Sequence, residues 1–272
     1  QADTTGGFSI CTWSGSGSVG KITHGLGAKP KFIASKRRGG SNHSWAVYHG
    51  DFGREATSGH SSLKNSLTGT NNAAEYYLEL DSHYGMEQTD AWWNDTEPDS
   101  TYFTIGGNSD DSGQTYVAYV WAEKKGLSKF GWYTGNGNNN GPFIHTGFLP
   151  AMVMIKGADH ANGWFVFSHD MSIAPASYAS RSNESFRNRY MQLWDASTTA
   201  TANSTHGALE LQFASNGFKI GRSSSYINGS GKHSIYMAFA ARPYVSSGGT
   251  MSPANAQEMV ASAGGNTFTG TA

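Results

Sequence analysis

An internal duplication constrains this chain more than any other feature. The residues at 7–122 (the first half) are matched, type by type, by those at 129–240 (the second half), at offsets between 115 and 120 positions. The anchors of the match are aromatic, proline and lysine residues, paired as Trp13 with Tyr133, Pro30 with Pro150, Lys36 with Lys156, Trp45 with Trp164 and Phe103 with Phe218. Solenoid repeats and propeller blades are only roughly 20 to 50 residues long, so two units of this length predict a tandem pair of domains.

Hydrophobic periodicity within each half is that of β-strands. In the run 116–122, successive side chains would point to opposite faces of a strand, and the side chains of both faces are largely apolar. This pattern is typical of a strand with one buried face and a second apolar face. The run 235–239 repeats this pattern, and clusters of Gly, Asn, Asp and Ser between such runs supply turns. Neither half sustains a helical period over a dozen positions. The sequence therefore predicts an all-β fold of two tandem antiparallel β-sandwiches, of the jelly-roll or lectin-like kind.

The duplication also predicts the domain boundaries. The first β-sandwich repeat is expected at 1–125 and the second at 126–245, and the linker between them is short enough for the two to pack side by side. The extension 246–272 is poor in strand formers, but the Ser-Pro pair at 252–253 is typical of a helix start and predicts a short helix. This extension is either a loose tail or a docking arm for another subunit.

The composition is poor in charge. Of 272 residues 14% are charged, against about 25% in an ordinary soluble domain, so Ser, Thr, Asn and Gly must supply most of the polar surface. The net charge is −1 and the longest basic block is 36–38, which argues against nucleic-acid binding. No apolar run approaches the roughly 20 residues that cross a bilayer, so no membrane insertion is expected. Cys11 is a lone cysteine in an apolar run, and we expect it to be a small buried side chain.

One pair of carboxylates supports an enzymatic alternative. Glu79 and Asp81 alternate along a strand, which places both on one face, and retaining glycosidases use two carboxyl groups about 5 Å apart. The pair resembles the start of the Glu-x-Asp-x-x-Glu motif of retaining β-glucanases with a lectin-like sandwich, but Tyr84 occupies the third acidic position. The second half has Gln192 and Trp194 in the corresponding strand. We therefore predict no catalytic residue and keep a polysaccharide-degrading enzyme as the alternative.

The sequence predicts no metal site, although calcium binding is kept as an alternative. The ten histidines are scattered and no cluster of Cys and His occurs, so zinc is not expected. Calcium could bind through loop carboxylates, either Asp110 with Asp111 or Asp95 with Glu97 and Asp99. Acidic turns are more often simply solvated, so the prediction is a protein without a cofactor.

Aromatic residues outside the repeated core are the candidates for a ligand-binding surface. Flat rings stack on the apolar side of sugar rings, while neighbouring amides bond to sugar hydroxyls. The candidates of this kind lie in or near polar loops: Tyr84, Trp92, Trp93, Asn94, Tyr190 and Trp194. The alternative is that these rings cap the ends of the sandwiches.

A set of short runs carries a family resemblance. The runs of the first half and the linker are GLGAKPKFI (25–33), WAVYH (45–49), WNDT (93–96), YVAY (116–119) and SKFG (128–131). Those of the second half are GNG (135–137), GPFI (141–144), TGF (146–148), PAMVMIK (150–156) and SNGFK (215–219). Together they resemble a duplicated β-rich module of unassigned function in tail-fibre-like and other virion proteins of tailed, often marine, bacteriophages. The resemblance covers about 6–243, and the chain departs from it in the insertion 53–74 and after Tyr244.

The resemblance implies a location on the virion and a structural, non-enzymatic role as a fibre, tail or capsid-surface component. Its expected partners are other virion proteins, with host cell-surface polysaccharide as a further ligand. Fibres are usually symmetric, so the resemblance also implies a homo-oligomer, with a trimer favoured. A purely structural decoration protein, without a glycan ligand, is the remaining alternative.

Overall fold

The computed structural model of the chain describes residues 1–39, 44–52, 72–169, 190–193 and 209–241. Its strands form four antiparallel sheets, and two short 3₁₀ turns accompany them, η1 (Ala73–Glu75) and η2 (Gly107–Ser109). The all-β class and the antiparallel sheets predicted from the sequence are thus confirmed. The short helix predicted near 252–262 lies outside the described residues. No helix in the described part of the chain is long and apolar enough to cross a membrane.

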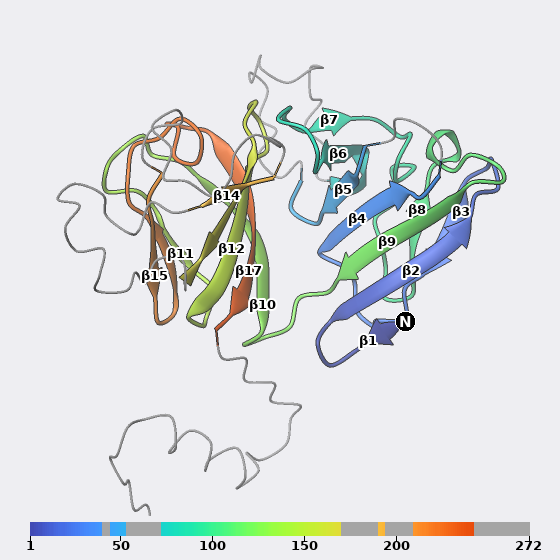
Figure 1. The fold of residues 1–272 in the computed structure, drawn as a ribbon, viewed down its shortest axis with the longest axis horizontal. Helices are drawn as coiled ribbons and strands as arrows, with labels where there is room; N and C mark the ends of the chain where they lie inside the picture. Colours follow the sequence, from blue (N-terminus) through green and yellow to red (C-terminus); the bar gives the residue numbers. More distant parts are fainter. Residues whose placement is uncertain (40–43, 53–71, 170–189, 194–208, 242–272) are drawn as a thin grey trace, which may run out of the picture.

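The first half contains a seven-stranded and a two-stranded sheet (Figure 1). The strands of the large sheet are, in spatial order, β1 (Ala2–Asp3), β2 (Phe8–Ser14), β9 (Thr115–Trp121), β4 (Phe32–Arg37), β5 (Ala46–His49), β6 (Tyr76–Glu79) and β7 (Glu87–Gln88). The small sheet pairs β3 (Gly20–Thr23) with β8 (Tyr102–Ile105). Trp13 of β2 meets Phe103 of β8 edge to face at 6.0 Å, so the two sheets pack against each other.

The second half contains a five-stranded and a three-stranded sheet. The strands of the large sheet are, in order, β10 (Ser128–Thr134), β17 (His233–Ala240), β12 (Pro150–Gly157), β13 (Trp164–Ser168) and β14 (Met191–Gln192). The small sheet holds β11 (Phe143–His145), β16 (Gly217–Ile220) and β15 (Leu211–Ala214), in that order. Phe218 of β16 packs edge to face on Tyr236 of β17 at 5.3 Å.

The two halves share one strand order. The row β2-β9-β4-β5-β6 in the first half corresponds to β10-β17-β12-β13-β14 in the second, and β3-β8 corresponds to β11-β16. The jelly-roll description is not confirmed. Among the described strands, β4, β5 and β6 are neighbours in one sheet with β9 on the other side of β4, and β12, β13 and β14 are neighbours with β17 on the other side of β12.

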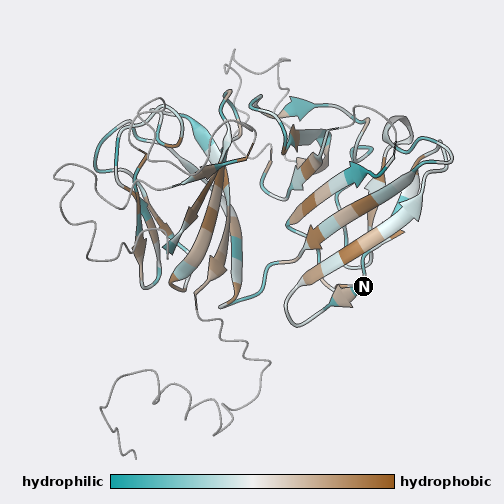
Figure 2. Ribbon diagram, in the orientation of Figure 1, coloured by the Kyte–Doolittle hydropathy of each residue, from teal (hydrophilic) through white to brown (hydrophobic). Residues whose placement is uncertain are grey.

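The two large sheets face each other across the middle of the molecule, and a small sheet lies outside each (Figure 1). Phe32 of β4 lies 6.3 Å from the rings of both Phe130 and Trp164, which belong to the second half. These residues share one apolar cluster with Met154 and Met237. Figure 2 shows hydrophobic residues along β2, β9 and β4 and along β12 and β17. Both faces of a large sheet are therefore covered with apolar side chains, as the double alternation in 116–122 predicts.

Hydrogen bonds join the two halves along this contact, which we call the seam. The indole of Trp164 donates to the Glu79 carbonyl at 2.8 Å, and the backbone N–H of Met86 donates to the Ala158 carbonyl at 2.7 Å. His49 is fully buried there, with Nε2 3.3 Å from the Tyr236 carbonyl. The halves thus form one continuous block.

Candidate functional site

Two of the predicted ligand-binding aromatics are buried in the core. The ring of Trp93 is 1% exposed and meets Tyr48 and Phe103 edge to face at 5.9 and 6.5 Å. Tyr190 is 4% exposed and packs on Phe165 at 5.4 Å. Neither ring can stack on a sugar in this structure, so their assignment to a ligand surface is corrected. Both rings pack inside the sandwiches. Like the alternative in which they cap the sandwich ends, this is a structural role and not a ligand-binding one.

The remaining predicted residues do not gather into one exposed surface. Trp92 is half-buried against Tyr77 at 5.6 Å, and Asn94 turns the chain with a φ of 49°. Tyr84 is 49% exposed and packs on His83 at 4.4 Å. Trp194 lies outside the described residues. Of the described candidates, Tyr84 is thus the one with a largely open ring.

The two acidic residues considered for catalysis contribute to the fold, Asp81 through its carboxylate and Glu79 through its main chain. Asp81 accepts the backbone N–H of Trp45 at 3.0 Å and lies 3.5 Å from the Lys36 amine. Glu79 uses its main-chain carbonyl to hold Trp164. These contacts give Asp81 a structural task at the start of β5.

Four of the five carboxylates considered for calcium, those of Glu97, Asp99, Asp110 and Asp111, are bound by donors or cations of the protein. Asp110 is buried and accepts the Trp13 indole at 2.8 Å and the backbone N–H of Ser16 at 2.9 Å. Glu97 pairs with Lys29. Asp99 accepts the N–H groups of Thr101 and Tyr102, and Asp111 pairs with Arg37 at 2.6 Å. Among the described residues no group of three or more His, Cys, Asp or Glu side chains is arranged to hold a metal ion.

An open aromatic surface lies elsewhere, on the outward side of the seven-stranded sheet. We call it the aromatic face, and its members are Phe8, Ile10, Trp45, Tyr119 and Trp121. Ring centroids link Phe8 to Trp121 at 4.9 Å, Tyr119 to Trp121 at 6.3 Å and Tyr119 to Trp45 at 5.8 Å. Ile10, opposite Tyr119, is 40% exposed, and the four rings are half-buried.

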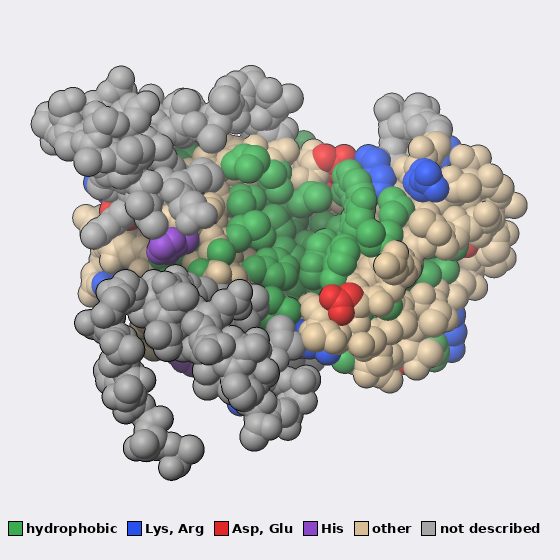
Figure 3. Space-filling model, turned by 60° about the horizontal axis from the view of Figure 1, so that its bottom comes forward, with side chains coloured by type: hydrophobic (Ala, Val, Ile, Leu, Met, Phe, Trp, Pro, Cys, Tyr) green, Lys and Arg blue, Asp and Glu red, His purple; other side chains and the backbone are tan. Residues whose placement is uncertain are grey.

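This surface continues into the seam. Trp121 contacts Phe32 at 5.5 Å, and Phe32 is covered by the second half. Met152, Val166 and Phe239 of the second half are also half-buried against the same cluster. Figure 3 shows apolar side chains gathered in one patch between the two halves. Large exposed apolar patches of monomers usually mark interaction sites. The alternation of 116–122 indicated a second apolar face, but the sequence could not show which part of it stays uncovered.

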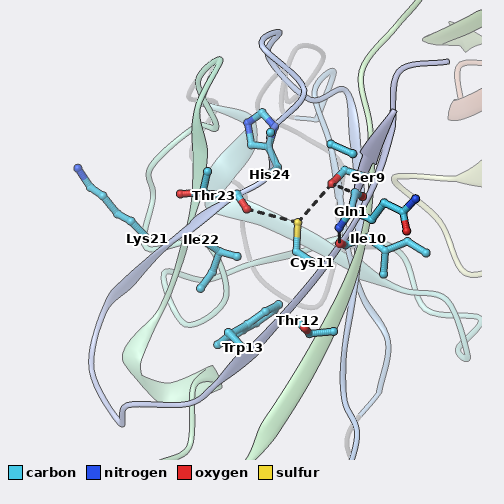
Figure 4. A pocket seen from close by; sticks show the side chains of 12 residues that line it. Gln1, Ser9, Ile10, Cys11, Thr12, Trp13, Lys21, Ile22, Thr23 and His24 are labelled. Carbon is cyan, nitrogen blue, oxygen red and sulfur yellow. Dashed lines mark hydrogen bonds between the residues drawn. The ribbon is translucent and has the colours of Figure 1, made fainter. Parts of the chain in front are cut away.

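A groove of about 550 Å³ opens at one edge of the first sandwich, between β2 and β3 (Figure 4). Its apolar walls include Cys11, Trp13 and Ile22, and Thr12 and Thr23 lie at its rim. We call it the edge groove. The Cys11 thiol donates to the Thr23 carbonyl at 3.6 Å, and burial raises the pKa of this thiol, which keeps it protonated. The expected small, buried role of Cys11 is confirmed, since its exposure is 7%.

A buried polar cluster lies at the upper end of the seam. This junction cluster consists of Lys156, Asp159, His160, Asn162 and His233. The Lys156 amine is 0% exposed and donates to the carbonyls of Tyr84 at 2.8 Å and Gly157 at 3.1 Å. Burial lowers the pKa of Lys156 to about 7.

Asp159 organises the other side of the junction cluster. Its two carboxylate oxygens lie 2.7 Å from His160 Nδ1 and 3.0 Å from His233 Nδ1. Burial alone would raise the pKa of Asp159, but the hydrogen bonds from His160 and His233 outweigh it and hold that pKa well below its usual range. Asn162 joins the two sides, since Oδ1 accepts the Gly157 N–H at 2.9 Å and Nδ2 meets His160 Nε2 at 2.9 Å. Because the buried Lys156 amine of the second half donates to the Tyr84 carbonyl of the first half, this arrangement suits holding the halves together.

Comparison with known proteins gives a family and a solved structure. A family model described as "Domain of unknown function (DUF7483)" matches residues 1–243. No curated protein matches the chain. The crystal structure of the major capsid protein P2 from Bacteriophage PM2 is similar at 11% sequence identity and a TM-score of 0.22, over 87% of this chain and 100% of that chain. A TM-score this low carries no argument about fold or function.

Proposed function

We propose that this chain is a non-enzymatic structural protein of a bacteriophage virion. It belongs to the family described as Domain of unknown function (DUF7483). It serves as a fibre, tail or capsid-surface component on the outside of the particle. Its partners are other virion proteins, and it assembles as a homo-oligomer, with a trimer favoured by the resemblance to fibre-like modules.

The aromatic face is the observation that carries this proposal. A particle protein must bind its neighbours over broad surfaces, and half-exposed aromatic rings are what interfaces enrich. Fully burying an aromatic side chain of this size stabilises a contact by about 1.5 to 3 kcal/mol. The face is contiguous and joins the seam, where the same sheet already packs against another sheet. It therefore fits a protein partner better than a small molecule.

Exchanging one residue of the aromatic face tests the proposal. Tyr119→Asp places a charge in the centre of the face, and Phe143→Asp is the matched control, because Phe143 is an aromatic strand residue, 48% exposed, on the small sheet of the second half. Each variant is supplied during infection, and the copies per purified particle are counted by quantitative mass spectrometry. We expect Tyr119→Asp to be depleted from particles and Phe143→Asp to be retained. Equal incorporation of both variants, or absence of the wild-type chain from particles, would refute the proposal.

Recognition of host surface glycan is a second candidate for the same rings. Phe8 and Tyr119 have ring planes only 8° apart, and parallel aromatic planes suit stacking on sugar rings. A glycan array with the wild-type chain and Tyr119→Asp tests this role. Binding that is lost in the variant supports it, and an array without signal for either protein supports a purely structural component.

A further inference from the structure

The seam covers the second-half counterpart of the aromatic face. Strand pairing sets the equivalence, because the register of β2, β9 and β4 matches that of β10, β17 and β12 position by position. Three members of the aromatic face have these counterparts in the second half: Phe130 for Ile10, Met237 for Tyr119 and Trp164 for Trp45. Each counterpart is at most 4% exposed, and Phe130 and Trp164 pack on Phe32 of the first half.

The first half contributes a different patch to the seam. Phe32 of β4 is 2% exposed, and His49 of β5 meets the Phe130 ring at 6.4 Å. Alternation along β5 puts Val47 on the same face as His49, and Leu78 of β6 lies opposite Val47. The side of the seam formed by the first half is therefore built from β4, β5 and β6, beyond the aromatic face.

The counterpart of this second patch is uncovered. In the second half, the positions of Phe32, Val47 and Leu78 are held by Met152, Val166 and Met191. We call these three second-half residues the methionine patch. Met191 is 42% exposed, and Met152 and Val166 are half-buried, whereas their first-half counterparts are at most 2% exposed.

The seam is therefore a heterologous contact. In a two-fold contact both halves would use the same surface, and equivalent residues would be covered alike. Here Phe130 is 2% exposed and its counterpart Ile10 is 40% exposed. Apolar side chains stay visible between the two halves in Figure 3. Each molecule thus keeps one partly open surface of each kind, the aromatic face on the first half and the methionine patch on the second.

From this asymmetry we propose that the methionine patch of one molecule docks on the aromatic face of a second molecule of this chain, in a contact that repeats the seam. The inference rests on the proposed function, because it names the partner of the aromatic face. Met152 takes the place that Phe32 has in the seam and lies between Ile10 and Trp45 of the other molecule. The Trp45 indole donates to the Gln192 carbonyl, as the Trp164 indole donates to that of Glu79.

The two surfaces are chemically complementary. Methionine is flexible, and its polarisable sulfur packs favourably on aromatic rings, of which the aromatic face offers four. Neither surface includes a charged residue. Lys36, 5.8 Å from the Trp45 ring, lies 3.5 Å from the Asp81 carboxylate. Docking therefore buries apolar area without burying an unpaired charge.

A contact of this kind can recur from copy to copy. A heterologous contact closes into a ring when the rotation between copies divides a full turn, and otherwise it continues into an open filament. In both arrangements every aromatic face inside the assembly is covered by the second half of a neighbour. Both also give the homo-oligomer of the proposed function.

Complementary variants test the proposal with the full chain. Ile10→Asp disables the aromatic face, Met152→Asp disables the methionine patch, and Phe143→Asp is the matched control, at a 48% exposed position on the small sheet of the second half. Sedimentation velocity over a range of concentrations measures association. Wild type and the control should form oligomers. Each disabled variant should raise the dissociation constant at least about tenfold, because the contact would bury a charge without a partner.

A mixture of the two disabled variants identifies the pairing. The Ile10→Asp protein keeps its methionine patch and the Met152→Asp protein keeps its aromatic face, so one contact between them stays intact. A one-to-one mixture should therefore form heterodimers, although each protein alone stays monomeric at the same concentration. Circular dichroism and thermal melting verify the fold of each variant. If Met152→Asp fails to fold, Met191→Asp replaces it, because Met191 is largely exposed.

Three outcomes would overturn the proposal. They are a wild-type chain that is monomeric at every concentration, a disabled variant that associates like wild type, and a mixture without heterodimers. Association of Met152→Asp but not of Ile10→Asp would mean that the aromatic face pairs with itself.

Failure of this inference is distinguishable from failure of the proposed function. A monomeric wild type whose Tyr119→Asp variant is still depleted from particles would mean that another virion protein covers the aromatic face. In that case the proposed function stands and the inference falls. Oligomers that respond to the variants as expected, together with equal incorporation of Tyr119→Asp and Phe143→Asp into particles, would refute the proposed function alone.

Discussion

Replacing Lys156 by methionine should make the stability of the protein less dependent on pH. The amine is completely buried, it faces neutral carbonyl and amide oxygens, and burial lowers its pKa from 10.5 to about 7. The folded state therefore binds the proton of Lys156 less tightly than the unfolded state does. A group with a lowered folded pKa destabilises the fold at low pH, and the penalty shrinks as pH rises from 7 to 10.5.

The magnitude follows from the shift. Each pKa unit corresponds to about 1.4 kcal/mol, so the buried amine costs about 4 kcal/mol at pH 7 and about 1 kcal/mol at pH 10. Methionine removes this cost but leaves the Tyr84 and Gly157 carbonyls without their donor, a loss of about 1 to 3 kcal/mol. Lys156→Met should therefore stabilise the protein at pH 7 and destabilise it at pH 10. Between these two pH values, the difference in free energy of unfolding between variant and wild type should change by about 3 kcal/mol.

Urea unfolding of wild type and Lys156→Met between pH 6 and 10 measures this difference. Lys36→Met is the matched control, because Lys36 is the equivalent residue of the first half but is partly exposed, paired with Asp81 and 5.8 Å from the Trp45 ring. The control should shift the free energy of unfolding by a similar amount at every pH. Parallel pH curves for wild type and Lys156→Met would refute the lowered pKa of the buried amine.

Three further predictions concern the seam and the contact of Gly131 with the Tyr236 ring. Burial lowers the pKa of His49 to about 4, so stability should fall by up to about 3 kcal/mol as pH drops from 6.5 to 4, and His49→Gln should remove most of that slope in acid unfolding curves. Trp164→Phe deletes the seam hydrogen bond to Glu79 and should cost about 1 kcal/mol in urea unfolding, whereas Trp45→Phe in the first half should cost less. Gly131→Ala pushes a methyl group against the Tyr236 ring and should cost about 1 to 3 kcal/mol in thermal unfolding, with an unchanged melting temperature indicating that the ring moves aside freely.

Most of the fold class was predictable because it depends on local patterns. Alternating apolar residues and turn clusters predicted antiparallel strands, and matched anchors such as Trp45 and Trp164 predicted two related units. The strand order was not predictable, since it depends on which edges meet in space. The jelly-roll expectation is not confirmed by the observed strand order and stays a prediction.

The candidate site was harder to predict, because exposure is decided by tertiary contacts. Lys36 and Lys156 are the next-to-last residues of equivalent strands, yet Lys36 reaches solvent whereas Lys156 is buried and bonded to the Tyr84 carbonyl. Trp93 stands in a polar sequence but enters the core beside Tyr48. The signal that could have found the aromatic face was the second apolar set in 116–122. A sequence alone could not reveal that the other half covers only part of that set.

The seam has a consequence for inheritance. Phe130 and Trp164 pack against Phe32 of the other half, and Met154 and Met237 belong to the same apolar cluster, which both halves build. Produced alone, either half would expose the apolar face of its large sheet to water and would aggregate. Once the doubling had occurred and these residues had become apolar, neither half could be deleted without losing solubility. Recombination should therefore exchange the two halves together, as a single unit.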